Sequence, residues 1–331
     1  MSRSRSRVHK MLVLTISAAC SGLVATGCAE VPSRVPGEAS AAACAGVDKV
    51  DFAVRALRVG IGASGLAVDG DSAFVANPYA GEVSRISKTL ALERRKNIGG
   101  SPDAMVSDGK QLWVAARDGG RILALSIDSL SITSSQRVDT PVALALAVDN
   151  VFALSLDNGE IQPFTPAGAP GPAIQTPVVA PSQMVAVDAV LYVLGAGDRS
   201  VIPLAASDGR YLGPGARLPV ESVGGLYSIA GSPWVSSPSD HSLIRLANSG
   251  EPSETFRNPN GLAASFAAGN NCLIWAASAD GRVAALDPTT GDWSRTRRIA
   301  RSIGGLAVGA GKVWITDPRD GLVLRLSPID R

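Results

Sequence analysis

Residues 305–326 read GLAVGAGKVWITDPRDGLVLRL. Small and apolar residues at 305–308 predict a first strand, and residues 312–316 predict a second strand with a tryptophan at its centre. The glycines between them, and the Asp, Pro and Gly residues that follow, are typical of tight turns. A third strand is expected at 322–326. The stretch therefore predicts three antiparallel strands in succession.

The same unit recurs along the chain, and one aromatic residue marks the second strand of each copy. These aromatics are Phe74, Trp113, Phe152, Tyr192, Trp234, Trp275 and Trp314. Their nearly constant spacing, with strand signals throughout, indicates the repeat of a β-propeller. We expect an all-β, seven-bladed β-propeller with four-stranded blades at residues 51–331.

The seventh blade needs an outer strand, and the sequence offers one from its N-terminal side. Residues 55–59 followed by GLAV at 65–68 match residues 295–299 followed by GLAV at 305–308, with a constant offset of 240. The segment 51–59 therefore has the pattern of an outer strand with no inner strands before it. We expect it to complete the last blade and close the ring, which removes exposed sheet edges.

Residues 1–27 have the pattern of a lipoprotein signal peptide. Four Lys or Arg residues precede an apolar stretch at 11–24, and small residues then lead to Cys28. That stretch is short for a membrane span. The small residues before Cys28 resemble the bacterial lipobox, whose cysteine carries the lipid. Cys20 is a rival site, and an ordinary secretory signal is the other interpretation. We expect a lipid-anchored protein on the extracytoplasmic face of the bacterial cell membrane.

Residues 28–50 are rich in Ala, Ser, Pro and Glu and predict a flexible tether. The whole chain has a net charge of +2, and residues 1–27 carry four basic and no acidic residues, so the remainder carries −2. This charge gives no support for binding to nucleic acid, which needs a basic surface. We expect the propeller domain to be a monomer.

Two cysteines remain beyond the lipobox, Cys44 and Cys272. An exported protein lies in an oxidising compartment, where two thiols can pair. Cys44 precedes the expected closing strand, and Cys272 belongs to the neighbouring sixth repeat, so the two can approach each other. The alternative is that Cys272 is a buried small apolar residue and that Cys44 stays free.

Ligands of propellers usually bind where the loops joining outer to inner strands meet the loops joining second to third strands. The second set of loops supplies the candidate ligand-binding residues, which are Asn77, Tyr79, Arg117, Asp118, Asp198, Arg199, His241, Asp317 and Arg319. Such a ring suits an anionic or sugar-like ligand. The alternative is turn chemistry, because Asp and Asn favour tight turns.

Basic residues are frequent in the expected outer strands of several repeats. They include Arg94, Arg95, Lys96, Arg295, Arg297, Arg298 and Arg301. One interpretation is protection of strand edges, since charged side chains discourage pairing with a second sheet. The other is a patch for an anionic partner.

Residues 313–317 (VWITD) and 286–291 (LDPTTG) resemble YVTN-type and NHL-type propeller repeats, and the layout of 51–331 resembles the virginiamycin B lyase-like group. The resemblance implies a propeller, and lyases of that group use His and Glu around a divalent cation. We find no such constellation in this sequence, because His9 lies in the signal segment and only His241 remains.

Other catalytic signatures are also missing from the sequence. It has no Cys/His cluster for zinc beyond the signal segment and no Gly-x-Ser-x-Gly motif. No cofactor is predicted, and a divalent cation held by ring carboxylates stays open.

The leading hypothesis is a non-catalytic binding or scaffold lipoprotein of the cell envelope, whose partner is an envelope protein or a glycan. The alternative is an extracytoplasmic lyase or hydrolase with a divalent metal in the channel of the propeller. A third possibility is a sensor that reads an envelope ligand for a partner protein.

Overall fold

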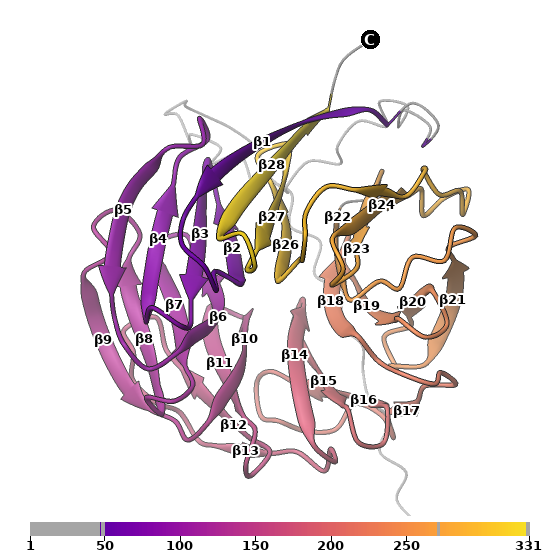
Figure 1. Ribbon diagram of the computed structural model, residues 1–331. Coiled ribbons are helices and arrows are strands. Elements are labelled where there is room, and N and C mark those ends of the chain that lie inside the picture. The colour runs from indigo at the N-terminus through magenta and orange to yellow at the C-terminus, as the bar shows by residue number, and fades with distance from the viewer. Residues whose placement is uncertain (1–46, 48–49, 270–271, 329–331) are drawn as a thin grey trace, which may run out of the picture. The chain divides into compact units, whose positions relative to one another are not determined.

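The structure is a computed structural model that describes residues 47, 50–269 and 272–328. The chain divides into residues 1–42 and 43–331, and all described residues belong to the second part. This part consists of seven antiparallel sheets of four strands each, which Figure 1 shows side by side around a ring. The expected all-β, seven-bladed propeller is therefore confirmed.

Blades 1 to 6 each use four strands that are consecutive in the chain and run from the centre of the ring outward. Blades 1 and 2 are β2 (Gly65–Asp69), β3 (Ser72–Asn77), β4 (Glu82–Ile86), β5 (Leu92–Asn97), β6 (Pro102–Ser107), β7 (Gln111–Ala116), β8 (Arg121–Ser126) and β9 (Ile132–Arg137). Blades 3 and 4 are β10 (Pro141–Ala147), β11 (Asn150–Ser155), β12 (Glu160–Phe164), β13 (Ile174–Gln175), β14 (Pro181–Val187), β15 (Val190–Gly195), β16 (Ser200–Ala205) and β17 (Ala216–Arg217). Blades 5 and 6 are β18 (Gly225–Ile229), β19 (Ser232–Ser237), β20 (Ser242–Leu246), β21 (Pro252–Arg257), β22 (Phe266–Gly269), β23 (Ile274–Ala277), β24 (Arg282–Leu286) and β25 (Arg297–Arg298).

Blade 7 combines the two ends of the domain. Its inner strands are β26 (Gly305–Gly309), β27 (Lys312–Asp317) and β28 (Leu322–Pro328), and its outer strand is β1 (Phe52–Arg58). The strands β1 and β28 pair antiparallel from Phe52 opposite Pro328 to Arg58 opposite Leu322. The predicted closure by an N-terminal strand is confirmed, and Figure 1 shows β1 lying along β28.

The ring is also continuous at its centre, where each inner strand contacts the next and β26 contacts β2. Small residues are needed there because neighbouring strands converge. A Cβ atom at Gly65 would lie 2.1 Å from the carbonyl oxygen of Asp103, and one at Gly305 would lie 2.5 Å from that of Ser64. The inner strands therefore carry glycine where two blades come closest.

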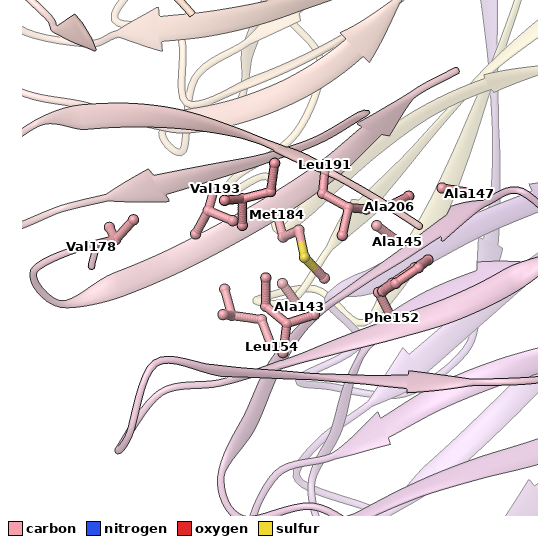
Figure 2. Close-up of a cluster of buried hydrophobic side chains, with 12 residues drawn as sticks. Ala143, Ala145, Ala147, Phe152, Leu154, Val178, Met184, Leu191, Val193 and Ala206 are labelled. Atoms are coloured by element: carbon pink, nitrogen blue, oxygen red, sulfur yellow. The ribbon is translucent and has the colours of Figure 1, made fainter. Parts of the chain in front are cut away.

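The seven repeat aromatics all lie on the second strand of their blade, and none is more than 6% exposed. Each belongs to a hydrophobic cluster that joins its blade to the next one. Figure 2 shows Phe152 and Leu154 of blade 3 facing Met184, Leu191 and Val193 of blade 4. Full burial of one such side chain stabilises the fold by about 1.5–3 kcal/mol.

Three outer strands are only two residues long, namely β13, β17 and β25. Short strands limit the exposed edge that a second sheet could pair with. The longer outer strands β5 and β9 are polar or charged at most positions. The circumference of the ring is therefore protected in two different ways.

Candidate functional site

The loops joining outer to inner strands and the loops joining second to third strands meet at one face, which we call the loop face. The Ser302 hydroxyl donates to Asp317 at 2.7 Å, and the Glu221 backbone N–H donates to Asp240 at 3.2 Å. The Asn77 amide donates to the carbonyl oxygen of Ile61 at 3.0 Å. Polar side chains thus connect the two sets of loops within each of these blades.

One position in these loops has the same backbone conformation in all seven blades. It is the residue directly before the third strand, and its φ angle lies between +52° and +95° in every blade. Five blades place glycine there, as expected for the left-handed region. The seven residues are Gly81, Gly120, Gly159, Arg199, His241, Gly281 and Gly321.

Blades 4 and 5 are the exceptions, with Arg199 at φ +57° and His241 at φ +52°. A residue with a Cβ atom costs roughly 1–2 kcal/mol in this conformation. Two neighbouring blades therefore carry large polar side chains at positions where the rest of the ring carries glycine. Strained residues of this kind often occur at binding sites.

Arg199 borders a hollow between blades 4 and 5 on the loop face. The hollow has a volume of about 430 Å³ and is lined by Ala196, Gly197, Arg199, Glu221, Ser222 and Val223. Arg199 donates through Nη1 to the carbonyl oxygens of Val220 at 2.6 Å and Glu221 at 3.4 Å. These contacts hold the guanidinium beside the loop that enters blade 5, and the lining mixes charged, hydroxyl and backbone groups.

Asp240 links this loop to His241. Its carboxylate accepts hydrogen bonds from the Ser237 hydroxyl and the Glu221 backbone N–H. The hydrogen bond from Ser237 is the main cause that lowers the pKa of Asp240. The Glu221 N–H and the nearby charges of Arg257 and His241 act in the same direction, and together these effects outweigh partial burial. Asp240 is therefore ionised at neutral pH beside the exposed His241.

Several of the predicted site residues stabilise their own turns. Asn77 is 6% exposed and accepts from the Ala80 N–H. Asp198 accepts from the backbone and hydroxyl of Ser200. These contacts are the turn chemistry that the sequence offered as the alternative for this ring. Asp118 instead accepts from the Ser101 hydroxyl in the loop before β6, and so joins the two sets of loops of blade 2.

Asp317 is the most enclosed of the predicted site residues, at 1% exposed. Burial raises its pKa, but hydrogen bonds from the Ser302 hydroxyl and from backbone N–H groups, including those of Arg301 and Asp320, outweigh burial and lower the pKa of Asp317. The carboxylate connects the loop before β26 to the loop after β27. Its position is that of a structural anion.

Three predicted residues present their side chains away from such turns. Tyr79 is 86% exposed, and Arg319 is also exposed. Arg117 forms an ion pair with Asp103 at 3.0 Å. Together with Arg199 and His241 they lie in different blades around the loop face, and only Arg199 of the predicted set lines the hollow between blades 4 and 5.

Glu221 and Ser222 belong to the loops joining outer to inner strands, which were expected at this face, but no single residue of those loops was named as a candidate, and the shared glycine position was not recognised. Alignment of the repeats at the residue before each third strand would have shown Arg and His replacing Gly. Blades 4 and 5 are divergent repeats, which obscured that alignment.

The divalent-cation site implied by the resemblance does not fit the described residues. Within them, no group of three or more His, Cys, Asp or Glu could hold a metal ion. Residues 47, 50–269 and 272–328 also contain no helix that is both long and apolar enough to cross a membrane. Cys28 and Cys44 lie outside the described residues, so the lipidation and the pairing of Cys44 with Cys272 stay predictions.

Comparison with known proteins identifies the fold and nothing finer. No family model and no curated protein matches the sequence. Virginiamycin B lyase from Staphylococcus aureus superposes with a TM-score of 0.73 at 14% identity, over 84% of this chain and 100% of the lyase. The RRP9 WD40 repeats superpose with a TM-score of 0.72 at 15% identity, over 84% of this chain and 100% of the RRP9 chain. BamB from Moraxella catarrhalis superposes with a TM-score of 0.56 at 19% identity, over 80% of this chain and 84% of the BamB chain.

Proposed function

We propose that the protein is a cell-envelope lipoprotein whose propeller is a non-catalytic binding module, and that it binds its partner over the hollow between blades 4 and 5. The observation that carries the proposal is the replacement of glycine by Arg199 and His241 at the shared left-handed position. Both residues hold a strained left-handed backbone in adjacent blades, and the Arg199 side chain lines the hollow.

The chemistry of the hollow favours a polar partner. A guanidinium, a hydroxyl and a carboxylate are supplied by Arg199, Ser222 and Glu221, and the imidazole of His241 belongs to the next blade. Arginine binds carboxylate and phosphate groups with two parallel hydrogen bonds and also stacks on planar groups. We therefore propose an acidic segment of an envelope protein or an anionic glycan as the partner.

The test is photo-crosslinking in intact cells. A benzophenone amino acid replaces Ala196, which is exposed, lines the hollow and contributes only a methyl group. The matched control carries the same group at Lys110, an exposed residue between β6 and β7 at the opposite face. We expect a defined adduct from position 196 and none from position 110. Adducts from position 110 alone, or from neither position, would contradict the proposed site.

The lipid anchor is tested separately by mass spectrometry of the mature N-terminus. We expect diacylglycerol and acyl mass on Cys28, because stable anchoring needs more than one acyl chain. An unmodified N-terminus downstream of residue 28 would refute the lipoprotein assignment and leave the binding site untouched. Metal analysis of the purified protein addresses the enzyme alternative, which requires a stoichiometric divalent ion.

A further inference from the structure

The outer wall of blades 6, 7 and 1 concentrates basic residues. Their outer strands β25, β1 and β5 carry seven Arg or Lys and one acidic residue, Glu93. The outer strands of the other four blades carry three Arg and one Glu. We call the first set the basic wall, and its basic members are Arg55, Arg58, Arg94, Arg95, Lys96, Arg297 and Arg298.

The wall is continuous across the three blades. Arg297 of blade 6 forms an ion pair with Asp51 at 3.1 Å, directly before β1. Arg95 of blade 1 donates to the carbonyl oxygen of Val59 at 2.9 Å, directly after β1. Both ends of the closing strand are thereby attached to the neighbouring outer strands. Figure 1 shows β1 and β5 on the outside of the ring.

Much of this charge is not neutralised within the domain. Among the residues that the structure describes, Arg55, Arg94 and Lys96 are exposed and have no ion pair or side-chain hydrogen bond. Glu93, the one acidic residue of the wall, is paired with Arg85 at 3.2 Å. Of the three Arg on the outer strands of the other blades, Arg137 is paired with Asp139 at 3.8 Å, and Arg217 and Arg257 have no ion pair within the described part of the chain. The wall therefore differs from the rest of the circumference in how many basic residues it gathers. Protection of edges alone does not require three adjacent strands of one sign.

The wall is also where the N-terminal segment joins the domain. The strand β1 begins at Phe52, and the segment before it leads back to Cys28. The sequence predicts a flexible tether there, and a flexible chain of that length spans roughly 25 Å root-mean-square. An anchor at Cys28 would hold the membrane within reach of blade 7 and of the basic strands on either side.

We propose that the basic wall docks the propeller sideways on anionic phospholipid headgroups, beside its own lipid anchor. The inference rests on the proposed envelope location and adds a second, electrostatic contact with the membrane. Attraction to anionic lipid falls off within the Debye length of about 8 Å at physiological salt, so the flanking strands contribute without full contact. Each basic residue near such a surface strengthens binding by about fivefold.

The experiment is co-sedimentation with vesicles of the chain from residue 28 onward carrying Cys28→Ser, so that no lipid is attached. We expect binding to vesicles of equal parts phosphatidylglycerol and phosphatidylcholine, weak binding to pure phosphatidylcholine, and loss of binding at about 0.5 M salt. The variant Arg55→Glu, Arg94→Glu, Lys96→Glu should bind at least about 100-fold more weakly. The control Arg137→Glu, Arg210→Glu, Arg217→Glu makes the same change in net charge on blades 2 and 4 and should bind like the parent.

An equal loss of vesicle binding in the basic-wall variant and in the control variant would overturn the proposal. Equal binding of the parent to anionic vesicles and to pure phosphatidylcholine vesicles would overturn it as well. So would preference for soluble polyphosphate over vesicles, which would indicate an anionic polymer as the partner. Melting temperatures near that of the parent establish that the variants are folded. Failure of this experiment leaves the crosslink at position 196 and the lipid on Cys28 unaffected, so the two proposals fail separately.

Discussion

The guanidinium of Arg297 lies 4.3 Å from the centre of the Phe52 ring and stacks over it. The same ring meets Trp275 edge-on, with the ring centres 5.3 Å apart. Arg297 and Trp275 belong to blade 6, whereas Phe52 begins the closing strand of blade 7. The closing strand is therefore secured to the neighbouring blade as well as to β28.

Removal of residues 51–59 should destabilise the whole domain, because β28 loses its outer partner β1 along its full length and becomes an exposed edge. Phe52→Ala is the milder test and should cost about 3–5 kcal/mol, since the side chain is 6% exposed. Val54→Ala in the same strand, where the side chain is 41% exposed, should cost less than about 1 kcal/mol. Urea unfolding measures both, and equal costs would argue against the closure described here.

Asp317→Asn should destabilise the fold in a pH-dependent way. The pKa of Asp317 is lower in the folded than in the unfolded state. The ionised carboxylate therefore adds to the free energy of unfolding above the unfolded pKa of about 3.9, and this stabilisation is lost as the pH falls from there through the folded pKa. We expect a cost of about 1–3 kcal/mol at pH 7 that shrinks toward pH 3. Unfolding at both pH values measures it, with the exposed Asp292→Asn as control. A cost that does not vary with pH would show that the charge is unimportant.

His241→Gly should stabilise the domain relative to His241→Ala. Both variants lack the imidazole, but only alanine keeps a Cβ atom at φ +52°. The difference should be about 1 kcal/mol in favour of glycine. Thermal unfolding decides this, and an alanine variant that is as stable as the glycine variant would mean that the position is not strained.

The proposed export to an oxidising compartment leads us to expect a disulfide between Cys44 and Cys272, although Cys44 lies outside the described residues. The two positions are far apart in the sequence, and closing so long a loop contributes up to about 5 kcal/mol in the chain-entropy model. Alkylation of the denatured, unreduced protein should leave both cysteines unmodified, and reduction should expose them. Labelling of both without a reductant would exclude the bridge.

The repeat signal was sufficient to predict the ring and its closure from the sequence. The aromatic period placed residues such as Trp314 on second strands, and the offset of 240 between Arg55 and Arg295 identified the closing strand. The site was less predictable, because Asp and Asn serve turns and ligands alike. Asp317 is buried in its own turn, whereas Arg199 borders a hollow. That difference depends on side-chain packing between loops that are far apart in the sequence.

The most direct test of the binding site is the yield of the adduct from position 196 after Arg199→Asn and His241→Asn are introduced together. Asparagine tolerates the left-handed conformation, so the melting temperature should stay within a few degrees of the parent, and we expect the adduct to be lost. Tyr79→Asn with Arg319→Asn alters exposed residues of blades 1 and 7 on the same face and should leave it. An unchanged adduct in the first double variant would contradict the proposed binding site.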